Sequence, residues 1–91
     1  TSDNPRSEDP GQIIQDILSG LPVHAQENDH FVCISSRGEA IQFAINKARP
    51  GDIVLITGKG HENYQILSSG TIHFDDREVA ATALKKRMLL D

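Results

Sequence analysis

The chain has 91 residues and a formal net charge of −4, and 24% of its residues are charged. This length permits one small domain, which would bury only about 60–65% of the surface that its unfolded chain exposes. The acidic balance and the scattered basic residues argue against nucleic-acid binding. The sequence also lacks an apolar run of the roughly 18–20 residues that a membrane span requires.

The first predicted helix follows a polar opening segment. Asp9 suits the N-cap, Pro10 suits the first helical position, and Gln12 could close a capping box. Apolar residues then recur at helical spacing at Ile13, Ile14, Ile17, Leu18 and Leu21. The helix is expected to end near Gly20, because Pro22 prevents its continuation.

A second helix is predicted between two short strands. Residues 31–34 are apolar and β-prone, and residues 52–56 give the strongest strand pattern, with both faces expected to be covered. Ser36 and Glu39 form a capping box. The apolar stripe of the helix comprises Ala40, Ile41, Ala44, Ile45 and Ala48. Cys33, the single cysteine, is expected to be a buried core residue, which fits a reducing cytoplasm.

A β-hairpin and a third helix complete the chain. Residues 64–67 and 71–74 flank the predicted turn Ser68-Ser69-Gly70. Asp75 and Glu78 make a third capping box, and the apolar positions that follow are Val79, Ala80, Ala83, Leu84 and Met88. Arg77 is interpreted as part of a helix-start ion pair. The run Lys85-Lys86-Arg87 is interpreted as a solvated helix end that complements the helix dipole.

This order of elements predicts an α/β domain. Strands separated by helices favour parallel pairing through right-handed crossovers, so residues 1–91 are expected to form a single piece with a mostly parallel sheet and a C-terminal hairpin. Two buried strands and a hairpin cannot cover three apolar helix faces. Further parallel strands are therefore expected N-terminal to Thr1, and the lack of an initiator Met suggests a cut fragment.

A loop with binding potential follows the second predicted strand. Ligands of open α/β sheets bind beyond the carboxyl ends of the strands, where Gly58-Lys59-Gly60-His61-Glu62 lies. The glycines let the backbone approach a ligand closely, and the other three side chains supply charge and hydrogen bonds. The pattern of a nucleotide P-loop is absent. A tight surface turn is the alternative interpretation.

The opening motif Asp3-Asn4-Pro5-Arg6 is the second candidate. Asp3 and Asn4 can bend the chain through local amide bonds, and Pro5 fixes its own φ, so the turn would hold Arg6 rigidly. A guanidinium can grip a carboxylate through two parallel hydrogen bonds. The alternative is a helix-leading turn with an exposed Arg6. Together, Arg6 and Glu62 suit a ligand that carries both a carboxylate and an ammonium group.

Three motifs resemble the C-terminal domain of the Mur ligases. They are Asp3-Asn4-Pro5-Arg6, Gly58-Lys59-Gly60-His61-Glu62 with Tyr64-Gln65, and Phe74-Asp75-Asp76-Arg77-Glu78. The resemblance covers essentially the whole chain, and the first motif marks family members that add meso-diaminopimelate instead of lysine. It implies a Rossmann-like three-layer sandwich, of which this chain would be the C-terminal part.

The resemblance implies substrate-binding roles for both loops. Arg6 would hold the distal carboxylate of meso-diaminopimelate, with Asn4 bonding the same end and Asp3 and Pro5 shaping the loop. Lysine lacks that carboxylate and would leave Arg6 desolvated and unpaired, at a cost of about 1–3 kcal/mol or more.

In the second loop, Gly58 (through its backbone) and Glu62 would contact the distal amino-acid group, with Glu62 paired to the ammonium. Lys59 and His61 are assigned supporting roles, as loop-shaping or phosphate-side contacts rather than acid–base groups.

The family reaction is ATP-driven amide-bond formation on a UDP-MurNAc-dipeptide. By resemblance, ATP and Mg are bound mainly by two preceding domains, on which this chain would pack in a bacterial cytoplasmic enzyme. A further substrate-contacting arginine is expected upstream. The chain alone is expected to be inactive, with no catalytic residue.

No metal site is predicted within the chain, because His24, His30 and His73 are irregularly spaced. Two other hypotheses remain open at this stage. One is a stand-alone, non-catalytic α/β amino-acid-binding module. The other is an ADP- or phosphate-binding module that uses residues 58–60.

Overall fold

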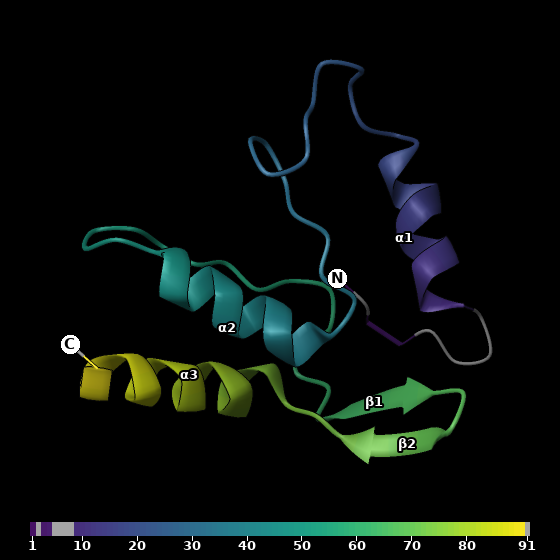
Figure 1. Cartoon of the computed structure of the whole chain (residues 1–91). Coiled ribbons are helices and arrows are strands. Elements are labelled where there is room, and N and C mark those ends of the chain that lie inside the picture. The colour runs from purple at the N-terminus through teal and green to yellow at the C-terminus, as the bar shows by residue number, and fades with distance from the viewer. Residues whose placement is uncertain (2, 5–8, 91) are drawn as a thin grey trace.

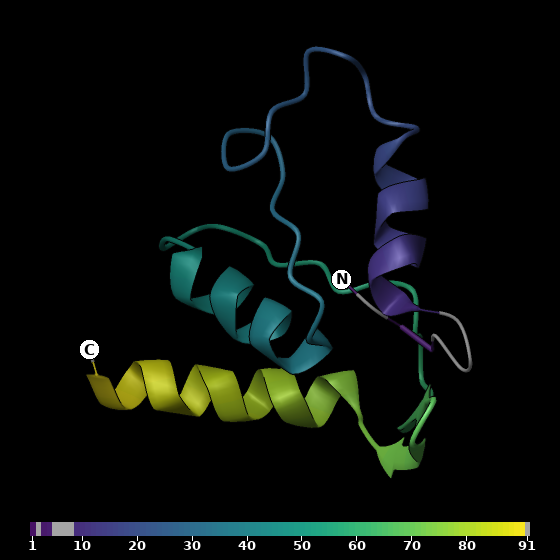
Figure 2. The same cartoon turned by 45° about the vertical axis from the view of Figure 1, so that its right-hand side comes forward.

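The computed structural model describes Thr1, residues 3–4 and residues 9–90. It contains three helices and one hairpin: α1 (Pro10–Leu18), α2 (Arg37–Lys47), β1 (Tyr64–Leu67), β2 (Gly70–His73) and α3 (Asp76–Leu90). Helices α2 and α3 lie side by side, whereas α1 stands apart from them (Figures 1 and 2). Within these described ranges, no helix is long and apolar enough to cross a membrane.

Helix α1 begins as the sequence predicts. The Asp9 side chain accepts a hydrogen bond of 2.9 Å from the Gly11 amide, and Pro10 occupies the first helical position. The capping box with Gln12 is wrong, because the Asp9 side chain accepts from the Gly11 amide and the Gln12 side-chain Nε2 donates to Asp16 one turn further on (2.9 Å). The helix ends at Leu18, ahead of the Gly20 stop. Its apolar face is only partly covered, since Ile14 is buried but Ile17 is exposed.

The core lies between α2 and α3. The Ser36 side chain caps α2 by accepting from the Glu39 amide (3.3 Å), as predicted. In this cluster the buried apolar side chains are Ile41, Ile45 and Ala83, and the half-buried ones packed against them are Ile56, Phe74, Val79 and Ala80. The apolar stripes of the two helices therefore cover each other.

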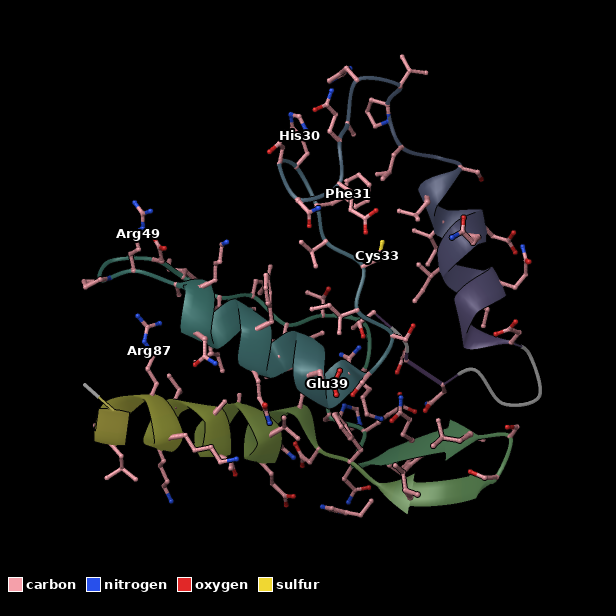
Figure 3. All side chains as sticks on the ribbon, in the orientation of Figure 1. His30, Phe31, Cys33, Glu39, Arg49 and Arg87 are labelled. Carbon is pink, nitrogen blue, oxygen red and sulfur yellow. The ribbon has the colours of Figure 1, made fainter. Side chains whose placement is uncertain are left out.

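The C-terminal half of α3 is less covered than its start, which agrees with the expectation that this chain cannot cover three apolar helix faces. Leu84 and Met88 are exposed, because α2 is the only helix that packs on α3 among the described residues and the apolar stripe of α3 is wider than that contact. The interpretation of Lys85-Lys86-Arg87 as a solvated end is wrong for Arg87. Its half-buried guanidinium donates to the Ile45 carbonyl, and Figure 3 shows it reaching from α3 toward the end of α2.

The hairpin is confirmed with a shift of one residue. Strands β1 and β2 pair antiparallel from Tyr64↔His73 to Leu67↔Gly70. The turn is therefore Ser68-Ser69, and Gly70 enters the second strand with a φ of 132°, which disfavours a side chain. The amide of Phe74 donates to the Asn63 carbonyl (3.0 Å) and extends the pairing beyond the strands.

The two predicted parallel strands do not form in the part of the chain that the structure describes. Residues 31–34 contribute only an isolated bridge between Glu27 and Phe31, and residues 52–56 join no ladder. Residues 52–56 were expected to be covered on both faces. Instead, the side chains of Ile53 and Leu55 are 91% and 82% exposed. A strand requires a hydrogen-bonded neighbour, and none is present among these residues. Cys33 is half-buried instead of belonging to the core, on the side facing α1 in Figure 3.

Residues 53–56, between α2 and β1, still keep a strand-like alternation. Val54 and Ile56 are better covered than Ile53 and Leu55, and Ile56 packs on the α2–α3 core. Successive side chains of a β-strand point to opposite faces, so the residues alternate as a strand does. With its helices and antiparallel hairpin, the described structure is a partial α/β domain.

The start of α3 confirms the ion pair expected for Arg77. One oxygen of Asp75 accepts from the Arg77 amide (2.9 Å) and Nε (3.1 Å), and the other accepts from Nη2 (2.8 Å). These hydrogen bonds, the side-chain ones foremost, lower the pKa of Asp75 from 3.8 to about 2. Asp75 therefore stabilises the folded state above its ordinary pKa, and this contribution is lost as the pH falls toward the lowered value.

We expect Arg77→Ala to reduce the acid sensitivity of folding. Without Arg77, the pKa of Asp75 returns toward its ordinary value of 3.8, so less stability is lost between that pH and about 2. Urea-unfolding midpoints of both proteins, measured across this pH interval, check the expectation. Parallel acid profiles for wild type and variant would contradict it.

Candidate ligand-binding site

The described part of the opening motif lies against β1. The Gln65 side-chain amide donates to the Asp3 carbonyl (2.6 Å), and the Ile66 amide donates to the Asn4 side-chain oxygen (2.8 Å). Both bonds join residues 62 positions apart. The described part of the N-terminal stretch, residues 3–4, passes close to the hairpin in both views (Figures 1 and 2). Asp3 and Asn4 are half-buried there.

The loop from Gly58 to Glu62 borders the same motif. Gly58 and Gly60 have φ values of 104° and 62°, in the region that favours glycine. A Cβ atom added to Gly58 would lie 3.9 Å from Oδ2 of Asp3, so this backbone is next to the motif. The amide of Glu62 donates to the Lys59 carbonyl (3.3 Å) and closes the turn. The two sequence motifs are therefore neighbours in space.

Glu62 is oriented by the first residue of β1. The hydroxyl of Tyr64 donates to Oε2 of Glu62 at 2.8 Å, and Glu62 is half-buried. An ionised carboxylate has about four acceptor positions. The bond to Tyr64 therefore fixes the carboxylate while leaving it acceptor capacity for a cationic ligand group.

Lys59 points into the protein. Its side chain is buried, its ammonium donates to the Tyr64 carbonyl, and it lies 5.3 Å from the ring centre of Tyr64 and 6.0 Å from that of Phe74. These cation–π contacts hold the loop on the hairpin. The geometry favours a loop-shaping role for Lys59. His61 is exposed at the tip of the same loop.

A buried ion pair behind the loop was missed by the sequence analysis. Arg37 donates through Nε and Nη2 to the two carboxylate oxygens of Asp76 (2.8 and 2.7 Å), and Nη2 also donates to the Thr57 carbonyl (3.0 Å). Thr57 directly precedes Gly58, so the pair fixes the point where the loop begins. A cation in the first turn of a helix opposes the helix dipole. Arg37 at the start of α2 was therefore a detectable anomaly.

The charge of Arg37 also connects the pair to the opening motif. The hydrogen bond to Asp76 is the main cause that raises the pKa of Arg37, and the negative charge of Asp3 adds to it. Oδ1 of Asp3 is buried and has no hydrogen-bond partner among the described atoms. Asp3 is thus close to the Gly58 backbone and near enough to Arg37 for their charges to interact.

Two of the expected binding residues lie outside the described residues. Pro5 and Arg6 belong to the stretch from residue 5 to residue 8, so their ligand roles stay predictions from the sequence. Where the structure does describe the chain, no three His, Cys, Asp or Glu side chains are grouped to hold a metal ion. The described site thus contains Asp3 and Asn4 from one motif, and Gly58, Lys59 and Glu62 from the other.

Comparisons with a family model and with known proteins point to the same family. The sequence-family model described as "Mur ligase, glutamate ligase domain" matches residues 1–60 of this chain. The chain is 55% identical over 85 residues to a UDP-N-acetylmuramoyl-L-alanyl-D-glutamate--2,6-diaminopimelate ligase from Synechococcus sp. (strain WH7803), covering 93% of this chain and 16% of that protein. The ligase of the same name from Geobacillus kaustophilus is 56% identical over 87 residues, covering 96% of this chain and 17% of that protein.

A solved structure of a ligase with this name also matches. It superposes with a TM-score of 0.85 at 41% identity, covering 96% of this chain and 17% of that one. The chain spans about one sixth of the length of the curated relatives it matches. The family match over most of the chain and the close structural likeness agree. The chain belongs to the Mur ligase family, as a C-terminal piece of such a ligase.

Proposed function

We propose that this chain is the diaminopimelate-selecting part of an ATP-dependent ligase of peptidoglycan biosynthesis. The intact enzyme would add meso-diaminopimelate to UDP-N-acetylmuramoyl-L-alanyl-D-glutamate. Relatives of that name share about half of the aligned residues. The observation that carries the proposal is the pair of hydrogen bonds that seat Asp3 and Asn4 on β1, beside the Gly58–Glu62 loop.

The geometry suits a ligand with a distal amino-acid group. Glu62, held by Tyr64, would pair with the distal ammonium, and the Gly58 backbone would contact the same group. The Asn4 oxygen is occupied by the Ile66 amide, so its NH₂ group is the part suited to donate to the distal carboxylate. Arg6, two residues further along the chain, would grip that carboxylate with two hydrogen bonds.

Selection against lysine follows from the same arrangement. Lysine offers the ammonium for Glu62 but no distal carboxylate, so Arg6 would be desolvated without a partner. A site built to hydrogen-bond a substrate group rejects analogues that lack the group. The chain's own role in the reaction is therefore to bind and orient the attacking amino acid.

The remaining chemistry is assigned to other parts of the enzyme. ATP would activate the D-glutamyl carboxylate as an acyl phosphate, and ATP and Mg would be bound mainly by the N-terminal and central domains. Residues 1–91 would pack on those domains as a single piece of the C-terminal domain, in the bacterial cytoplasm. We assign Lys59 and His61 a supporting role in which they hold the shape of the loop.

A Rossmann-like three-layer sandwich is the architecture that we assign to the complete domain. The alternation along residues 53–56 supports it, because Val54 and Ile56 face the helix layer while Ile53 and Leu55 are bare. Surface hollows border this segment on several sides, and Val54 lines three of them. Parallel strands on its edges and a second helix layer on the bare face would cover it.

The same exposed residues weigh against a stand-alone amino-acid-binding module. A small domain that folds alone must bury most of its large apolar side chains. Ile53 and Leu55 are almost fully exposed here. A piece of a larger domain explains this exposure better.

Acceptor selectivity of the full-length enzyme tests the proposed function. Phosphate release from ATP, with UDP-N-acetylmuramoyl-L-alanyl-D-glutamate present, is measured with meso-diaminopimelate or with L-lysine. We expect efficient ligation of meso-diaminopimelate and a much lower kcat/KM for lysine. Equal use of lysine, or no product with meso-diaminopimelate, would refute the proposal.

A further inference from the structure

Strand β1 contacts both loops of the candidate site through three consecutive residues. Tyr64 bonds Glu62 and Lys59 of the second loop. Gln65 and Ile66 bond Asp3 and Asn4 of the opening motif. The distance between the two loops is therefore set by the spacing of adjacent residues on one strand. That spacing is a few ångströms, and the backbone of a paired strand holds it nearly constant.

Of the two bonds from β1 to the opening motif, the one made by Gln65 depends on a side chain of the strand. Gln65 is 6% exposed, and its Nε2 lies 2.6 Å from the Asp3 carbonyl oxygen. The neighbouring bond uses the Ile66 backbone amide, which a side-chain substitution at Ile66 leaves in place. Loss of the Gln65 donor would leave the Asp3 carbonyl without this bond in a half-buried position.

We infer that Gln65 is a positioning residue for acceptor selection. It fixes the Asp3 backbone on β1 next to Asn4, the described residue whose NH₂ group is assigned to the distal carboxylate of the ligand. This inference rests on the proposed function. Gln65 acts on the carboxylate end of the ligand, whereas Tyr64 orients Glu62 at the ammonium end.

This division of roles has a specific kinetic consequence. Loss of the Gln65 donor weakens the grip on meso-diaminopimelate, which has a distal carboxylate. Lysine has no such group, so its use is unaffected. The ratio of kcat/KM for meso-diaminopimelate to kcat/KM for lysine therefore falls, while the KM values for ATP and the nucleotide substrate stay constant.

The experiment uses the full-length enzyme with Gln65→Ala and Gln65→Met. The second variant keeps a side chain of similar length but has no hydrogen-bond donor, so it removes the bond without leaving a large cavity. Gln42→Ala, at an exposed position of α2, is the matched control. We expect the KM for meso-diaminopimelate to rise about fivefold to tenfold in both Gln65 variants, with kcat retained.

Each other outcome overturns the inference. KM values and acceptor ratios like those of Gln42→Ala would show that Gln65 does not position Asp3 and Asn4. A uniform loss across all substrates, or a lower melting temperature with an unchanged acceptor ratio, would show a purely structural role. Wild-type enzyme that ligates no meso-diaminopimelate would overturn the proposed function and this inference together, whereas normal wild-type selectivity with unaffected Gln65 variants removes only the inference.

Discussion

Replacing Arg37 with alanine is expected to destabilise the domain by about 3–5 kcal/mol, the usual cost of removing one partner of a buried ion pair. The side chains of Arg37 and Asp76 are only 4% and 9% exposed. The variant leaves the Asp76 carboxylate buried without its cation and removes a donor from the Thr57 carbonyl. Urea unfolding of the full-length protein, with hydrogen exchange read at α2 and α3, measures the loss.

The start of α3, where Asp76 lies, also provides a matched control. Arg77 also pairs with an aspartate, Asp75, but its side chain is 73% exposed, so water screens the pair. We expect Arg77→Ala to be much less destabilising at neutral pH than Arg37→Ala. Replacing both buried partners, as Arg37→Met with Asp76→Leu, should recover much of the lost stability. Equal effects of the two single arginine variants would contradict this account of the buried pair.

Replacing Glu62 with glutamine is expected to raise the KM for meso-diaminopimelate by about tenfold to a hundredfold, because hydrogen bonds to charged groups contribute about 1.5–3 kcal/mol. Glutamine keeps the size of the side chain and an acceptor for the Tyr64 hydroxyl. It removes the negative charge that would pair with the distal ammonium. Steady-state kinetics of the full-length enzyme, with meso-diaminopimelate varied at saturating ATP, measure the change.

Lysine gives this substitution a second test. Because lysine also carries the distal ammonium, Glu62→Gln should weaken the use of both acceptors, in contrast to the Gln65 variants. Glu39→Gln, at an exposed position in the first turn of α2, is the control for a lost glutamate charge. An unchanged KM for meso-diaminopimelate in Glu62→Gln would exclude Glu62 as the partner of the ammonium.

The helix starts and the hairpin could be predicted because their determinants are local. The caps at Asp9, Ser36 and Asp75 each bond an amide two or three residues away. The hairpin required only two β-prone runs and a turn. Its shift of one residue arises because Gly70 can adopt a positive φ and still pair with Leu67.

The misses involve partners that are distant in the sequence or are absent from the described residues. The pattern of residues 52–56 indicates a strand, but a ladder needs a neighbour, and the described residues supply none. The Arg37–Asp76 pair joins positions 39 residues apart, and no local pattern specifies which carboxylate a given arginine meets. Whether Lys59 points inward or toward a ligand likewise depended on where the rings of Tyr64 and Phe74 lie.

The candidate site could be described only by combining the sequence motifs with contacts that the structure shows. Its residue types were evident from the two motifs, and their roles came from the family resemblance. The structure adds that Asp3 and Asn4 are bonded to β1 and that Glu62 is bonded to Tyr64. The assignment of ligand groups to these residues, and to Arg6, stays a prediction.

A crystal structure of the full-length enzyme with bound meso-diaminopimelate tests most directly whether Arg6 and Glu62 bind the two charged groups at the distal end of the ligand. We expect one cleft in which the distal carboxylate meets the Arg6 guanidinium and the distal ammonium meets the Glu62 carboxylate, with Gln65 still bonded to the Asp3 carbonyl. A ligand bound elsewhere, or Arg6 and Glu62 on opposite sides of the domain, would contradict the account.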